Sequence, residues 1–361
     1  MSTTPPTRMP RPATSSPATS SPASLQPATT SSPATSSPAT EPVVRVSGLR
    51  KTYGDKVAVA DVSFEVGRGE ILGILGQNGA GKTTTVEALA GLRTADAGSV
   101  SVLGLDPQSD PAPVREVLGV QLQESRLPAK LRVREALRLY ASFYTAPKDP
   151  EELITLLGLQ DTRDTAYENL SGGQKQRLSI ALALVGNPQI AILDELTTGL
   201  DPQARRETWD LIEAVRDSGV TILLVTHFMD EAQRLCDRVI VIDDGRVIAQ
   251  GTPSGLARQG RTGVTFRLTL QEPLKDVAML RALPSVTHLT SADATTTVSA
   301  GQRQTDSGTQ LEVTGGATVL PDVIIALHSR GIVPAEVQTI TPSLEDAFVA
   351  LVGHPSEKVS S

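Results

Sequence analysis

Residues 76–83 have the types and spacing of a phosphate-binding loop, G-x-x-x-x-G-K-[ST]. An apolar segment, residues 70–75, precedes the loop, and residues 84–92, with apolar side chains at helical spacing, follow it. Glycines let the backbone curl so that N–H groups point at phosphate oxygens, and the following helix directs its positive end at the same anion. We expect Lys82 to reach the β and γ phosphates of a nucleotide and the Thr83 hydroxyl to hold Mg²⁺. A glycine-rich turn that matches by chance is the alternative; the loop comprises Gly76, Gln77, Asn78, Gly79, Ala80, Gly81, Lys82 and Thr83.

Two acidic residues and a histidine end two further apolar segments. Residues 189–195 predict a buried parallel strand that finishes with Asp194 and Glu195. Residues 220–226 predict a second buried strand, which is followed by His227. Because ligands bind at the carboxyl ends of such strands, Asp194 is placed to hold the magnesium shell and Glu195 to polarise a water against a γ-phosphate. His227 is a candidate contact for that phosphate; a solvated acidic pair and a structural histidine are the alternatives.

A second glycine-rich turn precedes the apolar helix predicted at residues 178–185. Ser171 has the type of a helix N-cap, and Gly172 and Gly173 permit a ligand to approach the positive end of the helix. The turn therefore indicates a second anion site, with a simple helix start as the alternative. Tyr53, which precedes the phosphate loop in sequence, either stacks on a purine or packs against its strand.

Composition excludes several classes of protein. A net charge of -7, with no block dense in Lys and Arg, argues against a protein that works mainly by gripping nucleic acid. No apolar run approaches the roughly 18 residues of a membrane span, so we expect that the chain does not cross a bilayer by itself. The single cysteine, Cys236, excludes an internal disulfide and fits a reducing cytosol.

Changes in composition divide the chain into four parts. Residues 1–42 are almost entirely Pro, Ser, Thr and Ala and predict a disordered tail, which could serve as a tether or have no function. Residues 43–257 predict an α/β domain with a helical insertion at about 114–170. Residues 258–353 predict a small α+β accessory domain that carries no visible catalytic group, and residues 354–361 form a short tail.

The order of these motifs resembles that of the ATP-binding cassette (ABC) ATPases over residues 44–255. The series runs from the phosphate loop through Gln123, the segment Leu170-Ser171-Gly172-Gly173-Gln174, Asp194-Glu195 and Asp201 to His227. The resemblance implies a P-loop NTPase core with a helical signalling insertion and an N-terminal antiparallel β part. It also implies a head-to-tail homodimer, in which each ATP lies between the phosphate loop of one subunit and residues 170–174 of the other.

The resemblance assigns a role to each of these residues. Tyr53 would stack on adenine, and Thr84 would join the loop in binding ATP. Gln123 would touch Mg²⁺ and the attacking water, Glu195 would be the general base, Asp201 would signal across the dimer and His227 would contact the γ-phosphate. Leu196 stands where the family usually has proline, and this change loosens the turn that orients Glu195.

The end of the chain carries a shorter resemblance. Residues 342–348 are similar to the closing helix of ATP-binding subunits of bacterial drug exporters of the daunorubicin-resistance type. This similarity implies a peripheral ATPase at the cytoplasmic face of the membrane that serves a separate permease and binds no nucleic acid. A soluble cassette protein that acts on ribosomes or DNA is the alternative, and a nucleotide-binding regulator without turnover is a third reading. The transported substrate is not encoded in this chain, because specificity belongs to the permease.

Overall fold

The computed structural model describes residues 41–121, 127–258, 263–271, 274, 276–293, 309–340 and 343–352. Of the predicted N-terminal tail, only residues 41 and 42 are described, and the predicted tail at 354–361 is not described. Gln123, predicted to touch the metal and the attacking water, also lies outside the described residues.

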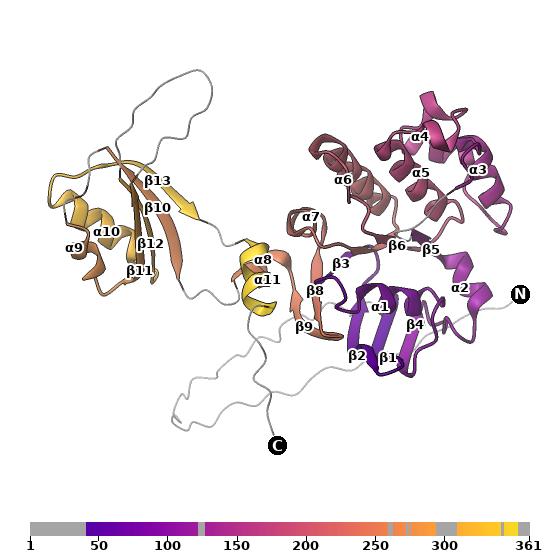
Figure 1. Cartoon of the computed structure of the whole chain (residues 1–361), viewed down its shortest axis with the longest axis horizontal. Helices are drawn as coiled ribbons and strands as arrows, with labels where there is room; N and C mark the ends of the chain where they lie inside the picture. Colours follow the sequence, from indigo (N-terminus) through magenta and orange to yellow (C-terminus); the bar gives the residue numbers. More distant parts are fainter. Residues whose placement is uncertain are drawn as a thin grey trace, which may run out of the picture. The chain divides into compact units, whose positions relative to one another are not determined.

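A nine-stranded sheet forms the centre of the larger part of the chain (Figure 1). Its strands, in spatial order, are β4 (Ala97–Val102), β1 (Val44–Tyr53), β2 (Lys56–Val66), β9 (Arg246–Gly251), β8 (Arg238–Asp243), β3 (Ile71–Leu75), β7 (Thr221–Val225), β6 (Ile190–Asp194) and β5 (Leu118–Gln121). Strand β1 pairs antiparallel with β2 and β4, whereas β8, β3, β7, β6 and β5 run parallel to one another. The predicted α/β core with an N-terminal antiparallel part is confirmed.

The parallel strands are apolar because both of their faces are covered. Every residue of β3, β6 and β7 is buried. Since successive side chains of a strand point to opposite faces, Ile71 and Leu75 of β3 join one hydrophobic cluster while Leu72 and Ile74 join another. Burial on both faces explains why these strands read as continuous apolar runs rather than as alternating patterns.

Helices cover each face of this sheet. On one face lie α1 (Lys82–Leu89) and α2 (Pro111–Val117). The other cluster contains residues of α3 (Val133–Ala141), α4 (Pro150–Leu156), α5 (Gly172–Leu184), α6 (Pro202–Asp217), α7 (Met229–Leu235) and α8 (Pro253–Arg258). Two short 3-10 turns, Gln160–Thr162 and Tyr167–Asn169, connect α4 to α5. Helices α3 and α4 form the predicted helical insertion, whereas β5, which falls within residues 114–170, belongs to the central sheet.

A second, antiparallel sheet of four strands has its own core. Its order is β11 (Val286–Asp293), β12 (Thr309–Gly315), β10 (Val264–Leu270) and β13 (Pro334–Ile340). Helices α9 (Ala278–Arg281) and α10 (Val319–His328) share a hydrophobic cluster with this sheet, and Phe266 is fully buried in it.

The last helix, α11 (Leu344–Val352), packs against α7 and α8. Leu344 is buried in the same hydrophobic cluster as α5 and α6, and Phe348 and Val352 pack against that cluster. Ser343 caps the helix, since its hydroxyl accepts a hydrogen bond of 3.1 Å from the Asp346 N–H. The segment that resembles the closing helix of drug-exporter subunits is therefore attached to the helix that follows His227.

Replacing Leu344 with Ala is expected to loosen this attachment. The change removes a side chain that is only 1% exposed, which costs about 2 to 5 kcal/mol of unfolding free energy for the unit that contains it. Denaturant unfolding and limited proteolysis near the C-terminus measure the effect. Val349→Ala, on the same helix but 63% exposed, is the matched control and is expected to stay within about 0.5 kcal/mol. Equal effects of the two substitutions would contradict the packing described.

Candidate nucleotide-binding and hydrolysis site

The phosphate loop joins β3 to α1, and two of its glycines are required by their surroundings. Gly81 is the residue before α1, with φ of 104°, and an added Cβ would lie 2.5 Å from the Ala58 carbonyl oxygen. A Cβ on Gly76 would lie 2.3 Å from the Ile242 carbonyl oxygen. No side chain caps the first turn of α1, so its N–H groups remain directed at the loop.

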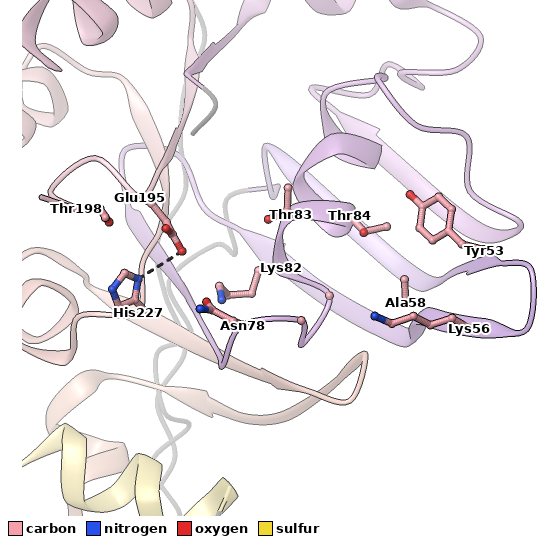
Figure 2. Close-up of a pocket in the computed structure, with 12 residues that line it drawn as sticks. Tyr53, Lys56, Ala58, Asn78, Lys82, Thr83, Thr84, Glu195, Thr198 and His227 are labelled. Carbon is pink, nitrogen blue, oxygen red and sulfur yellow. Dashed lines mark hydrogen bonds and ion pairs between the residues drawn. The ribbon is translucent and has the colours of Figure 1, made fainter. Parts of the chain in front are cut away.

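A cavity of about 690 Å³ opens beside this loop (Figure 2). Its walls include nine of the predicted site residues: Tyr53, Asn78, Gly79, Gly81, Lys82, Thr83, Thr84, Glu195 and His227. Three further residues line it that sequence reasoning did not select: Lys56, Ala58 and Thr198. Figure 2 shows Tyr53 and Lys56 at one end of the group and Glu195 and His227 at the other. The remaining loop residues, Gly76, Gln77 and Ala80, do not line the cavity.

Lys82 lies inside the loop. Its Nζ donates hydrogen bonds to the carbonyl oxygens of Gly76, at 2.8 Å, and Gln77, at 3.1 Å. Burial lowers the pKa of the ammonium group, and the carboxylates of Glu195 and Asp194 oppose that shift. A phosphate can therefore replace the two neutral carbonyl acceptors of Lys82, because its oxygens carry a charge opposite to that of the ammonium group.

Tyr53 is 42% exposed and has cations on its ring. The Lys51 ammonium lies 5.6 Å from the ring centroid and the Arg93 guanidinium 6.0 Å from it. Asp96 ties this end of β1, since it accepts hydrogen bonds from Lys51 Nζ and from the Thr52 backbone N–H, each 2.7 Å long. The hydrogen bond from Lys51, followed by those from Thr52, lowers the pKa of Asp96 to about 2. An exposed ring held at the mouth of the cavity suits stacking on a base.

Glu195 and His227 are brought together from the ends of β6 and β7. The Nδ1 of His227 lies 3.3 Å from the Glu195 Oε1 (Figure 2). Glu195 adopts a φ of 50°, in the left-handed region, and its N–H donates a 2.9 Å hydrogen bond to the Val225 carbonyl. Leu196, which follows it, is fully buried in the core. Packing of this leucine and the hydrogen bond to β7 thus hold the turn that proline would otherwise restrict.

Asp194 has the features of a metal ligand. Its side chain is 2% exposed, and its Oδ2 has no hydrogen-bond partner among the described residues. Gln121, on the neighbouring strand β5, accepts a 3.1 Å hydrogen bond from the Asp194 N–H and so fixes the backbone. A buried carboxylate oxygen with a spare lone pair and the Thr83 hydroxyl on the cavity wall are oxygen donors of the kind that Mg²⁺ prefers. These oxygen donors suit the metal chemically; Asp194 itself is not among the residues that line the cavity, and Gln123, the third predicted ligand, is not among the described residues.

The affinity of the protein for Mg²⁺ is expected to fall in acid. Burial, with a smaller contribution from Glu195, raises the pKa of Asp194 to about 6, so the carboxyl is protonated below that pH and must lose its proton to bind a cation. At pH 5 roughly one carboxyl in ten is ionised, so Mg²⁺ affinity falls about tenfold relative to pH 7. Titrating Mg²⁺ into the ATP-bound protein at both pH values measures this ratio. Asp194→Asn corrects for the titration of ATP itself, and an identical pH slope in both proteins would contradict the assignment.

The second anion site is built around the start of α5. Ser171 Oγ accepts a 3.2 Å hydrogen bond from the Gln174 N–H, and Gln174 Oε1 accepts one of 2.9 Å from the Ser171 N–H. This reciprocal capping box confirms Ser171 as the N-cap of α5. Ser171, Gly172, Gly173 and Gln174 line a separate cavity of about 350 Å³, whereas Leu170 is buried. None of the described residues lines both cavities, and residues 170–174 are absent from the lining of the cavity beside the phosphate loop.

Asp201 lies in the wall of the second cavity and begins α6. Its Oδ1 accepts hydrogen bonds of 3.0 Å from the N–H groups of Gln203 and Ala204, and these lower its pKa. Its predicted role in coupling two copies stays a prediction, since capping alone accounts for its contacts within one chain.

Comparisons with known proteins agree with this geometry. A family model described as ABC transporter matches residues 59–198. The doxorubicin resistance ATP-binding protein DrrA of Mycobacterium tuberculosis is 37% identical over 325 residues, which cover 88% of this chain and 96% of that protein. The Nod factor export ATP-binding protein I of Ralstonia nicotianae is 42% identical over 220 residues, 60% of this chain and 68% of that protein.

Solved structures agree as well. An ATP binding subunit of an ABC transporter covers 60% of this chain and 92% of its own length, with 31% identity and a TM-score of 0.55. An ATP-binding cassette in a dimeric post-hydrolysis state, bound to ADP and Pi, covers 58% of this chain and 98% of its own, with 27% identity and a TM-score of 0.52. Within the described part of the chain, no helix is long and apolar enough to cross a membrane. Because the Mycobacterium protein is matched over nearly its whole length, the chain belongs to the ABC transporter family, as one of its ATP-binding and ATP-hydrolysing subunits.

Proposed function

We propose that this chain is the ATPase of an exporter and drives efflux of a drug-like or other small molecule through a separate permease. The observation that carries the ATPase part of the proposal is the distribution of the candidate site residues over two cavities of one chain. The phosphate loop and Glu195 line one cavity, and Ser171 to Gln174 line the other. A head-to-tail pair of chains would join one cavity of each type into a complete site, as the dimeric relative bound to ADP and Pi illustrates for its own cassette.

Hydrolysis in this arrangement uses groups already in place. Lys82 exchanges its two loop carbonyls for phosphate oxygens, and Tyr53 stacks on the adenine. Glu195 accepts the proton of the attacking water, while His227, 3.3 Å from it, holds the carboxylate and contacts the γ-phosphate. Mg²⁺, when bound by Thr83 and Asp194, neutralises charge that develops on the phosphate oxygens. Ser171 to Gln174 of the partner then close the site to bulk solvent, with the attacking water held inside.

The proposal of export, rather than of action on ribosomes or DNA, rests on similarity to the relatives. Both relatives described above carry export or drug resistance in their names, and the Mycobacterium protein is matched over 88% of this chain, which is more than the cassette alone. A net charge of -7 gives no electrostatic support for a nucleic-acid partner. We place the chain at the cytoplasmic face of the cell membrane, where cassette closure would move the permease.

Affinity purification from native membranes in mild detergent tests the partner. We expect a multi-span membrane protein to co-purify in equal amount with this chain, and ATP hydrolysis of that complex to respond to the transported molecule. The Glu195→Gln chain, purified in parallel, should retain the same partner, because the substitution lies in the cavity and not on the outer surface. Recovery of ribosomes or DNA instead of a membrane protein would favour the alternative function.

A further inference from the structure

A buried acid, Glu231, lies next to the hydrolysis site and has no place in the mechanism described so far. It belongs to α7 and follows His227 by four residues. Its side chain is completely buried, which is unusual for a glutamate and costly unless polar partners surround it. Burial raises the pKa of this carboxyl, and neighbouring hydrogen-bond donors oppose the shift.

Three polar side chains from three different segments surround the carboxyl group. The Trp209 Nε1–H of α6 donates a 3.0 Å hydrogen bond to Glu231 Oε1. The Thr226 and Thr197 hydroxyls lie close enough to lower the pKa of the carboxyl group, whereas Glu231 Oε2 and Thr197 Oγ1 have no hydrogen-bond partner among the described residues. Thr226 Oγ1 accepts a 3.0 Å hydrogen bond from the Phe228 N–H, so its own hydrogen is available to Glu231. All three partners are buried.

Each of these side chains belongs to a segment that carries a residue of the site. Thr197 follows Glu195 by two positions in the turn after β6. Thr226 directly precedes His227 at the end of β7. Trp209 lies in α6, the helix that Asp201 caps. One carboxyl group therefore faces three segments: the turn that carries Glu195, the loop that carries His227 (the histidine loop), and α6, which begins at the second cavity.

A second contact joins α6 to the histidine loop. The Arg205 guanidinium lies 4.3 Å from the centroid of the Phe228 ring, and that ring lies 4.1 Å from the ring of His227. Arg205 also pairs with Asp230, at 3.5 Å. The contacts of Arg205 are partly exposed to solvent, whereas Glu231 is buried. Helix α6 and the histidine loop are therefore connected at two separate points.

We propose that Glu231 is a positioning residue for hydrolysis, which holds the turn of Glu195 and the loop of His227 in register with each other and with α6. This inference rests on the roles proposed for Glu195 and His227. A displacement of about 1 Å in a catalytic group reduces the rate by about 100-fold. Loss of the polar contacts between the two segments is therefore expected to lower the rate of hydrolysis. The same joint would carry a change at His227 to Asp201 at the second cavity.

The test compares Glu231→Gln with Glu231→Met in the full chain. Gln keeps an acceptor for the Trp209 N–H and can pair with the threonine hydroxyls, whereas Met fills a similar volume without hydrogen bonds. We expect Gln to retain kcat within about 3-fold and Met to lower kcat by about 10- to 100-fold, with ATP affinity changed less than about 3-fold. Unchanged kcat in the Met protein would overturn the proposal. Trp209→Phe and Thr226→Val each remove one donor and provide the same readout should the Met protein fail to fold; unchanged kcat in both would also overturn it.

A double-mutant cycle separates positioning from general destabilisation. If Glu231 acts through His227, adding Glu231→Met to His227→Ala changes the residual rate by less than about 3-fold. Rate losses that multiply would show that Glu231 does not act through His227 and would overturn the part of the proposal that concerns the loop of His227. A His227→Ala protein with wild-type activity would instead refute the proposed catalytic roles, so the two failures are distinguishable.

Discussion

Glu195→Gln is expected to lower the rate of ATP hydrolysis by about 10²- to 10⁴-fold while leaving ATP bound, because it removes the group that we propose accepts the proton of the attacking water. The amide is close in shape to the carboxylate, and the Glu195 backbone is held by the 2.9 Å hydrogen bond to Val225 and by the buried Leu196. Binding of ATP through Lys82 and the loop should therefore stay within about 3-fold of wild type. Phosphate release and binding of a fluorescent ATP analogue measure the two quantities.

Glu152→Gln provides the matched control, since it makes the same chemical change on an exposed turn of α4. It should leave both hydrolysis and binding unchanged. Wild-type hydrolysis by the Glu195→Gln protein would remove Glu195 from the reaction. Loss of ATP binding in that protein would show that Glu195 holds the nucleotide rather than its attacking water.

Gly173→Asp is expected to lower the rate of ATP hydrolysis by about 10²-fold or more without reducing the stability of the chain that carries it. A Cβ on Gly173 would have only an ordinary contact, 3.7 Å from the Ala204 Cβ, and an acidic residue in the first turn of α5 favours the helix. The described surroundings of Gly173 within one chain therefore leave room for a side chain. If a second chain presents a γ-phosphate to this turn, as proposed, a carboxylate facing that phosphate costs several kcal/mol.

Two comparisons isolate this effect. Gly173→Asn adds a side chain of the same size without charge and should have a smaller effect, whereas Gly316→Asp, in open space outside the cassette, should have none. Thermal unfolding and ATP binding at the phosphate loop should stay near wild type in all three proteins, so that only turnover separates them. A Gly173→Asp protein with undiminished hydrolysis would show that no phosphate approaches this turn.

The sequence predicts the centre of the fold because motif and burial agree there. The strands β3, β6 and β7 are short apolar runs that end in polar site residues, and both features survive in the structure. The capping of α5 by Ser171 was also predictable, since Ser three residues before Gln is the pattern of a capping box.

Other features depend on contacts between distant segments, which no local pattern encodes. Helix α7 has only seven residues, and its position depends on packing against α6 and α11. Lys56 reaches the cavity from the first position of β2 and Thr198 from a loop, where neither residue type is distinctive. Glu231 reads as a solvated charge in sequence, and only the meeting of α6, α7 and two strand ends makes it a buried acceptor.

The dependence of specific ATPase activity on chain concentration tests the shared site most directly. Among the described residues, none lines both the cavity of the phosphate loop and the cavity of Ser171 to Gln174, and the proposed function requires one cavity of each type from two chains. With sedimentation used to measure the fraction of dimer at each concentration, we predict that activity per chain rises with that fraction and vanishes as the protein becomes monomeric, while ATP still binds. Constant activity per chain down to fully monomeric protein would contradict the account.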